Sequence, residues 1–376
     1  MSKKRVAIIF GGQSSEHEVS RVSAQSVIEN IDKQKYEVET IGITKNGQWL
    51  KYDGPVEKIG SGDWENIAQK KLLESRPSQS ETASEITTVN SAKQVIAGNS
   101  KTPIDVVFPV LHGCNGEDGT IQGLFELAGI PYVGCGVLGA AVGMDKAYSK
   151  IIFEKEGLPQ GDYLVFSRKQ INNQMGDVVA QVEGRLTYPC FVKPSNAGSS
   201  VGVNKASDRE SLEKALIIAA KNDRRILVEE FIDGREIECA VLGNDDPVAS
   251  TVGEVVPCNE FYDYEAKYQV GDNSKVVIPA ENLPEETVAK IREYAVRAFK
   301  CLDCAGLSRV DFFVHKNTGE IYINEINTLP GFTQISMYPK LWAASGIPYS
   351  ELIDKLIELA FERYEDTRRE YTNTLD

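Results

Sequence analysis

Residues 309–327, RVDFFVHKNTGEIYINEIN, constrain the fold more than any other stretch of the sequence. Two runs rich in Val, Ile, Phe and Tyr flank a polar turn at 316–319, which predicts an antiparallel hairpin. Because residues two apart on a strand share a face, we expect Arg309 and Asp311 to point the same way on the first strand. On the second strand, the same alternation predicts one shared face for Ile321, Ile323, Glu325 and Asn327.

The acidic and amide side chains of this hairpin can converge beside a guanidinium. Asp311, Glu325 and Asn327 supply hard oxygen atoms, and Mg²⁺ is usually held by a few carboxylates together with substrate phosphates. Arg309 is the side-chain type that stabilises charge on a transferring phosphoryl group. A solvated hairpin would explain Asp311 alone, but it explains poorly a Glu and an Asn on an otherwise apolar face. We therefore expect a metal and phosphate site here.

Composition limits the class of protein. The chain has 376 residues, which predicts two or three domains, and a net charge of −14. This acidic balance argues against binding to nucleic acid or to a membrane surface. We expect no membrane span, because no apolar run approaches about 18 residues, and no signal peptide, because the first apolar run ends at Gly11. Seven cysteines, with no second C-x-x-C pair beside 301–304, are typical of a reducing cytoplasm.

The beginning of the chain has the pattern of an α/β domain. Residues 5–10, RVAIIF, form a continuous apolar run, which predicts a strand buried on both faces of a parallel sheet. Ser15 and Glu18 fit a capping box that opens a helix. Glu16 stands at the expected helix terminus, where its carboxylate suits a substrate ammonium. The simpler alternative is that Glu16 only complements the helix dipole.

Three further features precede the middle of the chain. His112 ends a second buried strand at 104–111, where α/β folds place ligands, although a lone His is more often structural. Residues 53–101 are polar and predict an insertion without chemistry. Residues 134–139 match G-x-G-x-x-G, but the preceding strand is very short and no acidic residue ends a following strand, so NAD binding is a weak alternative. Lys146, at the start of the next helix, is a better candidate for a functional residue than these glycines.

The middle of the chain carries the pattern of a nucleotide site. Lys193 ends a strand expected at 186–192, and the small, hydroxyl-rich loop 194–203 can bring backbone N–H groups close to phosphates. No Gly-Lys-Ser/Thr follows, so this is not a Walker loop. Carboxylates around the strand–turn at 225–236 could bind a nucleotide's amine and ribose: Glu229, Glu230 and Glu236. The polar-aromatic residues 258–275 predict a functional lid.

Together these pieces resemble the D-alanine–D-alanine ligase family of the ATP-grasp superfamily. The motifs occur nearly end to end in the family's order: GGQSSEHEVS, LHGCNGEDG, GMDK, KPSNAGSSVG, FYDYEAKY, RVDFF and EINTLPGFT. The resemblance implies a multidomain α/β and α+β fold. An N-terminal parallel-sheet α/β domain (1–134) would precede two ATP-grasp domains, a central one (135–233) and a C-terminal one (234–376).

The resemblance also implies an activity. One D-alanine carboxylate takes the γ-phosphate of ATP, and the amine of a second D-alanine attacks this acyl phosphate to give D-alanyl-D-alanine for peptidoglycan precursors. Such enzymes use two Mg²⁺ or Mn²⁺ ions, and the family forms homodimers in the cytoplasm. Because an acyl phosphate hydrolyses readily, a lid that excludes water has a chemical purpose.

The site residues carry over position by position as expectations. The expected metal ligands are Asp311, Glu325 and Asn327. The expected ATP contacts are Lys146, Lys193, Glu229, Glu230, Ile232, Glu236 and Lys267. The expected D-alanine contacts are Glu16, His112 and Ser336. The expected catalytic set is Glu16, Ser199, Tyr268, Arg309 and the backbone N–H of Gly331.

Alternatives remain open within and outside this family. A D-alanine–D-lactate or D-alanine–D-serine ligase would share the same ATP site, and Tyr268 in the lid favours the D-alanine type. A nucleotide-binding protein without catalysis would be expected to lack one of Arg309, Asp311, Glu325 and Asn327, and all four are present. Glu230 stands where the compared relatives carry Lys, from which we expect only a small effect on ATP affinity.

Overall fold

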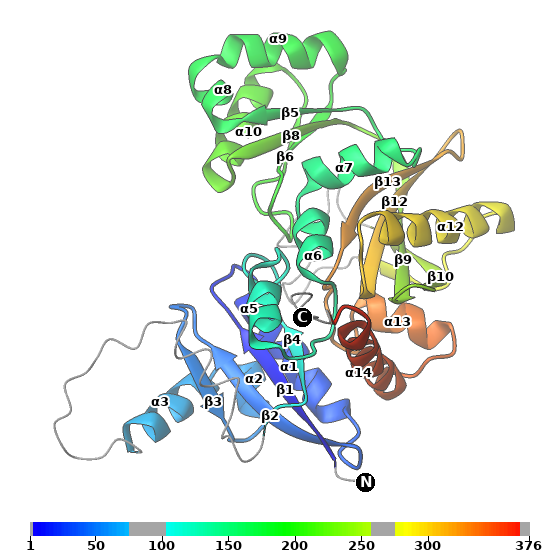
Figure 1. Cartoon of the computed structure of the whole chain (residues 1–376). Coiled ribbons are helices and arrows are strands. Elements are labelled where there is room, and N and C mark those ends of the chain that lie inside the picture. The colour runs from blue at the N-terminus through cyan, green and yellow to red at the C-terminus, as the bar shows by residue number, and fades with distance from the viewer. Residues whose placement is uncertain (1–2, 75–102, 257–274, 369–376) are drawn as a thin grey trace, which may run out of the picture.

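The computed structural model describes residues 3–74, 103–256 and 275–368. Its strands form three sheets, which follow one another along the chain. In Figure 1 the N-terminal sheet lies at the bottom in blue, the middle sheet at the top in green, and the C-terminal sheet at the right in yellow and orange. The expected fold class, an α/β unit followed by two α+β units, is confirmed.

The N-terminal sheet has the order β3-β2-β1-β4. Strand β1 pairs in parallel with β2 and β4, and its residues 6–10 are fully buried, as the apolar run predicted. The edge strand β3 is antiparallel, so the sheet is not wholly parallel. The bounds are β1 (Lys4–Gly11), α1 (His17–Asn30), β2 (Tyr36–Ile43), β3 (Trp49–Tyr52), α2 (Glu57–Ser61), α3 (Trp64–Glu74), β4 (Val106–Val110) and α5 (Thr120–Ala128).

The capping box expected at the start of α1 is wrong. Glu16 takes the N-cap position, and no side chain caps this helix end. Ser14, rather than Ser15, accepts the hydrogen bond from the Glu16 N–H, at 3.0 Å from N to Oγ. The serine that bonds to the backbone here lies one residue earlier than the spacing predicted. The Glu16 carboxylate does not cap the helix.

The middle sheet is antiparallel, with the order β5-β8-β6-β7. The strand expected at 186–192 begins only at Cys190, because Pro189 has no N–H to donate to a neighbouring strand. The bounds are β5 (Tyr163–Ser167), α8 (Arg168–Asn173), α9 (Met175–Arg185), β6 (Cys190–Pro194), β7 (Asn204–Ala206), α10 (Arg209–Asn222) and β8 (Arg225–Glu230).

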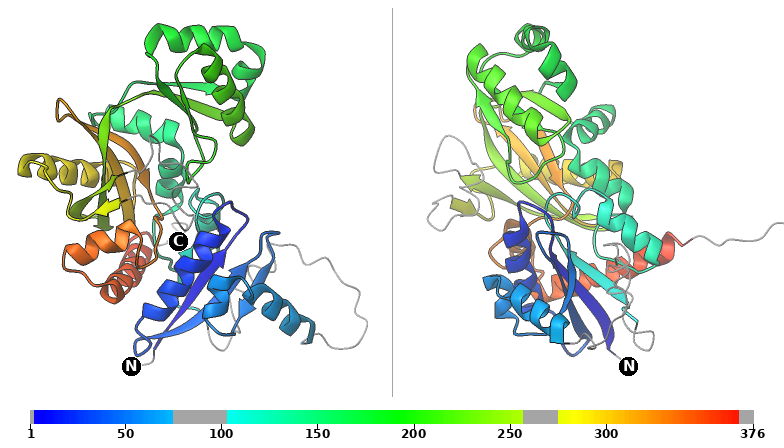
Figure 2. Two further views of the ribbon diagram at one scale, coloured as in Figure 1. Left: turned by 180° about the vertical axis from the view of Figure 1, so that it is seen from behind. Right: turned by 90° about the vertical axis from the view of Figure 1, so that its left-hand side faces the viewer.

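The C-terminal sheet is also antiparallel, with the order β11-β10-β9-β12-β13, and it ends in the predicted hairpin β12–β13. Helix α12 covers one face (Figure 2). The bounds are β9 (Gly234–Gly243), β10 (Val248–Val256), β11 (Lys275–Val277), α12 (Glu285–Cys301), β12 (Gly306–His315), β13 (Ile321–Asn327), α13 (Met337–Ala344) and α14 (Tyr349–Asp366).

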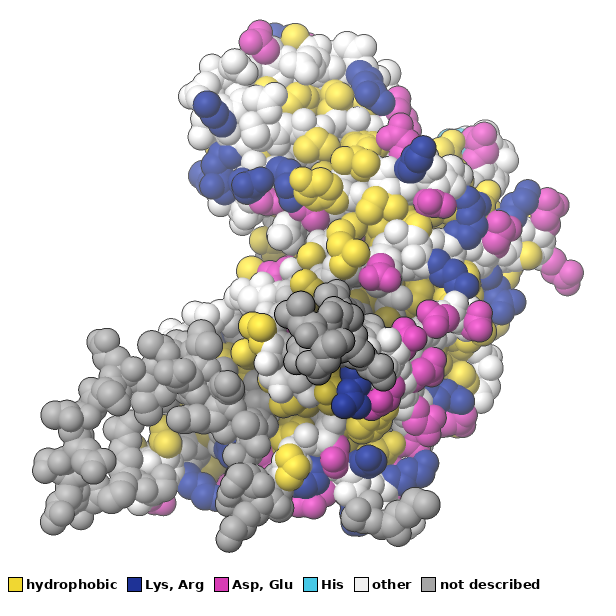
Figure 3. Space-filling view, in the orientation of Figure 1, with side chains coloured by type: hydrophobic (Ala, Val, Ile, Leu, Met, Phe, Trp, Pro, Cys, Tyr) yellow, Lys and Arg dark blue, Asp and Glu magenta, His cyan; other side chains and the backbone are white. Residues whose placement is uncertain are grey.

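Helices α6 (Val137–Met144) and α7 (Lys146–Lys155) pack on the C-terminal sheet, although the expected central domain 135–233 includes them. Ala140 of α6 and Phe153 of α7 lie in the same buried cluster as Phe312. Apolar side chains gather near the centre of Figure 3, where Figure 1 places these helices. The domain boundaries stay predictions, but α7 clearly ties the hairpin to the chain that enters the middle sheet.

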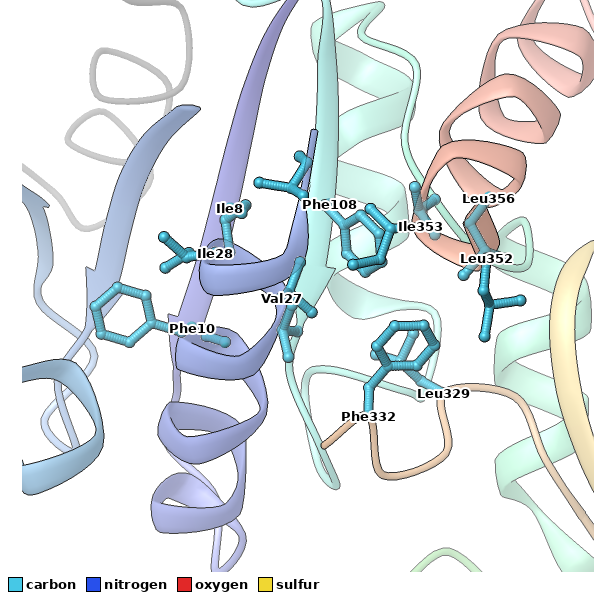
Figure 4. Close-up of a cluster of buried hydrophobic side chains, with 14 of the residues drawn as sticks. Ile8, Phe10, Val27, Ile28, Phe108, Leu329, Phe332, Leu352, Ile353 and Leu356 are labelled. Atoms are coloured by element: carbon cyan, nitrogen blue, oxygen red, sulfur yellow. The ribbon is translucent and has the colours of Figure 1, made fainter. Parts of the chain in front are cut away.

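A second core joins the two ends of the chain. Phe108 of β4 and Phe332, in the loop after β13, lie edge to face with ring centroids 5.8 Å apart. Leu352 and Leu356 of α14 belong to the same cluster, as Figure 4 shows. This packing holds the loop 328–336 against the N-terminal sheet. None of the helices in the described ranges is long and apolar enough to cross a membrane.

Candidate active site

A cavity of about 510 Å³ lies between the middle and C-terminal sheets. Its volume is in the range of small-molecule sites. Apolar walls come from Phe191, Phe231 and Phe313. Eight of the predicted site residues line it: Lys146, Lys193, Ser199, Glu229, Glu230, Ile232, Glu236 and Glu325. The structure thus brings most of the expected ATP contacts into one cavity.

The hairpin aligns the expected metal and phosphoryl residues on one face. Asp311 lies directly opposite Glu325, and Arg309 lies opposite Asn327. Residues opposite each other in a sheet project on the same side. The four side chains predicted from alternation therefore do share a face.

The prediction that Ile321 and Ile323 share that face is wrong. The register shifts after Asp311, so that Phe312 pairs with Ile323 and Asn324 is the extra residue of a β-bulge. A bulge re-aims the side chains that follow it. Ile323 consequently packs in the core cluster of Phe312 and reaches the cavity only at its wall, where Asn324 and Glu325 also lie.

Arg309 is held by two carboxylates. Its Nε and Nη2 donate to Asp311 Oδ1 and Oδ2 at 2.7 and 2.6 Å. Nε also lies 2.9 Å from Oε2 of Glu238, a residue of β9 that the sequence analysis did not single out. Burial acts to lower the pKa of the guanidinium, but the charges of Asp311 and Glu238 outweigh it and raise that pKa well above its ordinary value. Arg309 therefore remains a permanent cation.

Lys146 lies between the hairpin and the loop after β6. Its Nζ is 3.1 Å from Glu325 Oε2 and donates to the backbone oxygen of Ala197 at 2.9 Å. Asp145 caps α7, accepts a hydrogen bond from Ser195 Oγ at 2.6 Å, and pairs with Arg225 of β8. These contacts join α7 to the middle sheet and set the position of the Lys146 ammonium.

Glu229 is sandwiched between two lysines inside the cavity. Its oxygens lie 2.6 Å from Nζ of Lys150 and 2.6 Å from Nζ of Lys193. Burial acts to raise the pKa of Glu229, but the two ammonium charges together lower it to about 2. Lys193 also donates to Asn324 Oδ1 at 3.2 Å. Sequence analysis missed Lys150, although its spacing of four residues from Lys146 places both on one helix face.

Glu16 is buried, and the structure brings Ser199 to it from the middle sheet. Ser199 Oγ donates to Glu16 Oε1. Ser199 has a positive φ of 50°, and a Cβ on the neighbouring Gly198 would lie 2.9 Å from Glu16 Oε2. The loop 198–200 thus closes over the carboxylate only because Gly198 carries no side chain.

Glu117 is a second buried carboxyl group beside Glu16, and the sequence analysis missed it. It accepts a hydrogen bond from the Gly113 N–H at 2.7 Å. Burial, and then the negative charge of Glu16, raise the pKa of Glu117 well above its ordinary value. Glu117 therefore keeps its proton to a higher pH than an ordinary glutamic acid does. The motif HGCNGEDG contained this residue, but its burial depends on the fold.

His112 lies at the carboxyl end of β4, as predicted, and is buried. Its Nδ1 lies 3.0 Å from the backbone oxygen of Leu329, and its Nε2 lies 3.2 Å from Ser23 Oγ. Burial lowers the pKa of His112. The imidazole is thus neutral, with Nδ1 donating to Leu329 and Nε2 accepting from Ser23. It links the N-terminal sheet to the loop after β13.

Gly331 and Ser336 belong to that loop rather than to the 510 Å³ cavity. Ser336 Oγ accepts from the Thr333 N–H at 3.1 Å. A Cβ on Gly331 would lie 3.3 Å from Ser336 Oγ, so the two predicted residues are adjacent. Gln334 Nε2 donates to Asn30 of α1 at 2.8 Å, which holds the loop against the helix that follows Glu16.

Two of the remaining predicted residues, Glu230 and Asn327, bond to the backbone. Glu230 Oε1 accepts from the Asp162 N–H at 2.8 Å, so this carboxylate is engaged in holding the chain before β5. Asn327 Oδ1 accepts from the Leu329 N–H at 3.1 Å and shapes the turn after β13. The lid residues Lys267 and Tyr268 lie outside the described residues.

The G-x-G-x-x-G residues have a packing role. A Cβ on Gly139 would lie 2.4 Å from the backbone oxygen of Asp303, and a Cβ on Gly306 would lie 3.2 Å from the Cα of Gly134. Neither residue lines the cavity between the sheets. The glycines thus allow α6 to approach the start of β12 closely.

Comparison with known proteins gives matches over nearly the whole chain. Residues 5–135 match the family described as D-ala D-ala ligase N-terminus, and residues 152–358 match D-ala D-ala ligase C-terminus. The chain is 88% identical to D-alanine–D-alanine ligase of Ruminiclostridium cellulolyticum over 376 residues, with 100% of each chain covered. It is 64% identical to the ligase of the same name from Acetivibrio thermocellus, with 98% of this chain and 99% of the relative covered.

Solved structures agree with this result. The VanG D-Ala:D-Ser ligase from Enterococcus faecalis matches with a TM-score of 0.80 and 39% identity, covering 96% of this chain and 100% of that one. The D-alanine–D-alanine ligase from Coxiella burnetii matches with a TM-score of 0.79 and 34% identity, covering 97% and 96%. The full-length similarity, together with a cavity lined by the expected ATP contacts, shows that this chain belongs to the D-alanine–D-alanine ligase family.

Proposed function

We propose that this chain joins two D-alanines into D-alanyl-D-alanine at the expense of ATP, through a D-alanyl phosphate, for peptidoglycan precursor synthesis. The observation that carries the proposal is the pairing of cations and carboxylates in and beside the cavity. Lys146 pairs with Glu325, and Arg309 pairs with Asp311. The positive and negative charges of these side chains balance each other when no ligand is bound. When ATP and a cation bind, the lysine and arginine can pair with phosphates and the carboxylates with the cation.

ATP enters the cavity between the two sheets. Lys146 and Lys193 bind its phosphates, and the apolar wall of Phe191 and Phe231 together with Ile232 receives the base. Glu229 and Glu236 bind the polar groups of the nucleoside. Side chains perform little covalent chemistry in phosphoryl transfer, so placing the phosphates is the main task of these residues.

The residues of the hairpin fit a divalent cation. Asp311 and Glu325 are opposed on one face, with Asn327 two residues further along β13 on the same face. Hard oxygens of this number suit Mg²⁺ or Mn²⁺ completed by phosphate oxygens. Within the described ranges, no three His, Cys, Asp or Glu side chains form a metal cluster, which agrees with a site that needs the nucleotide's own oxygens. Two such ions, when bound, would neutralise charge on the phosphates.

The two D-alanines lie at the other end of the hairpin. Glu16 binds the ammonium of the first, and neutral His112 lies nearby. Arg309 and the N–H of Gly331 stabilise the oxyanion of the tetrahedral intermediate, and Ser336 binds the carboxylate of the second D-alanine. Glu16 is a buried carboxyl group that accepts a hydrogen bond from Ser199 Oγ, which supports its role toward an ammonium. Tyr268 and Lys267 would complete the site from the lid.

The test uses the purified full chain with ATP, MgCl₂ and D-alanine. We expect D-alanine-dependent release of phosphate and formation of the dipeptide in equal amounts. ATP binding without any D-alanine-dependent phosphate would instead support a nucleotide-binding protein without catalysis. An absence of both would refute the proposal.

A D-alanine–D-serine or D-alanine–D-lactate ligase is the second candidate, because one matched structure is a D-Ala:D-Ser ligase. Competition of D-alanine with D-serine and with D-lactate across pH, followed by product analysis, separates these activities. We expect D-alanyl-D-alanine to dominate, as the names of the curated relatives suggest.

We also propose that the chain acts in the cytoplasm as a homodimer. The resemblance to the family supports both statements. Light scattering of the purified chain measures the oligomeric state, and a monomeric mass at micromolar concentration would contradict the second.

A further inference from the structure

Three carboxylates lie in one row across the C-terminal sheet. Glu238 of β9 is directly opposite Asp311 of β12, which is directly opposite Glu325 of β13. Only 6% of the Glu238 side chain is exposed. The proposed function assigns Asp311 and Glu325 to the cation, but it assigns no role to Glu238. A buried carboxylate carries a large desolvation cost, so its partner indicates what it does.

One partner of Glu238 is Arg309, the arginine proposed to act in catalysis. Oε2 of Glu238 lies 2.9 Å from Nε of Arg309, and the hydrogen bonds of Arg309 to described residues use Nε and Nη2. The guanidinium is therefore approached by Glu238 from β9 and by Asp311 from its own strand.

We propose that Glu238 is a positioning residue, which holds Arg309 in place when Asp311 gives up its oxygens to a divalent cation. The inference rests on the proposed function, because it requires a metal at Asp311. With Asp311 as its sole carboxylate, Arg309 would either compete with the cation or lose its orientation when the cation binds. A second, fixed carboxylate removes this conflict.

The alternative, that Glu238 is itself a metal ligand, fits the structure less well. Neighbouring strands lie about 4.8 Å apart, so Glu238 and Glu325 are separated by about 9.6 Å across Asp311. No cluster of three acidic, His or Cys side chains suited to a metal occurs in the part of the chain that the structure describes.

The experiment compares Glu238→Gln with the wild type in two measurements. For steady-state kinetics, we expect kcat to fall about 100-fold with less than a threefold change in the KM for ATP, because misplacing a catalytic group by about 1 Å costs this much. For binding, we expect a Kd for Mn²⁺, followed by electron paramagnetic resonance with ADP present, that is about tenfold higher. Wild-type values in both measurements would overturn the proposal.

Measuring the Mn²⁺ Kd in an Arg309→Met background separates a positioning role of Glu238 from a role as metal ligand. If Glu238 acts through Arg309, adding Glu238→Gln to Arg309→Met changes the Mn²⁺ Kd less than twofold. If Glu238 is a ligand, the loss of affinity is the same in both backgrounds, and the proposal fails. This measurement does not require turnover, so the inactive Arg309→Met protein can be used.

Controls cover folding and the proposed function itself. Glu293→Gln breaks a Glu–Arg pair on exposed α12, where Arg297 Nη1 lies 3.6 Å away, and should leave kcat unchanged. If Glu238→Gln does not give a cooperative melt, Glu238→Asp replaces it. Its shorter reach should lower kcat and raise the Mn²⁺ Kd in the same direction but less than Glu238→Gln, and wild-type values of both would count against the proposal. A wild type without D-alanine-dependent phosphate release refutes the proposed function, whereas an active wild type with unaffected Glu238 variants refutes only this inference.

Discussion

Nζ of Lys146 lies 3.1 Å from Oε2 of Glu325. A residue expected to bind phosphate is thus paired with a residue expected to bind metal, and Arg309 and Asp311 repeat the arrangement. The entry of a nucleotide with its cation would exchange these partners without leaving a charge unpaired. Pairing of this kind offsets the desolvation free energy of the buried charges while no ligand is bound.

Replacing Glu325 with Gln should remove most of the activity and leave the fold intact. We expect kcat to fall by about 10²- to 10³-fold, because the oxygen charge that faces the phosphates is lost. The side chain is 28% exposed, so the free energy of unfolding should change by less than about 1 kcal/mol. Glu320→Gln, at the exposed turn of the same hairpin, is the control. Near-normal turnover of Glu325→Gln would remove this residue from the metal site.

Replacing Ser199 with Ala should weaken the first D-alanine site. Ser199 donates to Glu16, and one such hydrogen bond to a charged group contributes about 1.5 to 3 kcal/mol. The KM for D-alanine should therefore rise at least about tenfold, with little change in the KM for ATP. Ser207→Ala, at an exposed position after the same loop, should behave as the wild type. An equal rise in both KM values for Ser199→Ala would speak against a specific role.

Replacing Lys150 with Met should weaken nucleotide binding through Glu229. The change leaves a buried carboxylate with Lys193 as its remaining ammonium partner at 2.6 Å. Breaking a buried ion pair costs about 3 kcal/mol of stability, and Lys193 becomes less available to phosphate. Calorimetric titration with ADP should show a clearly higher Kd, restored in part by Lys150→Arg. Lys155→Met, exposed on the same helix, is the control, and unchanged ADP binding by Lys150→Met would refute the role.

The stability of the protein should depend on His112 between pH 7.5 and 5.5. Burial lowers the pKa of His112 below its ordinary 6.5. The unfolded chain therefore takes up a proton on this residue as the pH falls through 6.5, whereas the folded chain does not until lower pH. The unfolded state then binds more protons, so the free energy of unfolding decreases as the pH falls, by at most about 1.4 kcal/mol per pH unit.

Urea denaturation of the wild type and of His112→Asn at the two pH values measures this effect. The wild type should lose about 1 kcal/mol more than the variant on going to pH 5.5. Glu117, whose raised pKa acts in the opposite sense, is present in both proteins and cancels in the comparison. Equal losses in the two proteins would show that His112 is not the titrating group.

Local patterns predicted much of the secondary structure. The apolar run of β1 and the hairpin β12–β13 follow from periodicity and turn residues, which depend on neighbours in the chain. The pattern failed where one extra residue changed the alternation: the bulge at Asn324 places Ile321 and Ile323 opposite the core residues Val314 and Phe312 instead of on the face of Asp311. Alternation cannot predict a bulge, because its position is set by pairing with another strand.

The sequence by itself determined the family, the lysines that we expect to bind phosphate and the row of hairpin residues, since motifs and strand alternation are local properties. Only the tertiary structure brought Glu238 to Arg309, Glu117 to Glu16 and Lys150 to Glu229. Each of these depends on packing between elements far apart in the chain or on burial. Neighbouring charges also decide the pKa of a buried carboxyl group: burial and the charge of Glu16 raise the pKa of Glu117, whereas the two ammonium groups beside Glu229 lower its pKa to about 2.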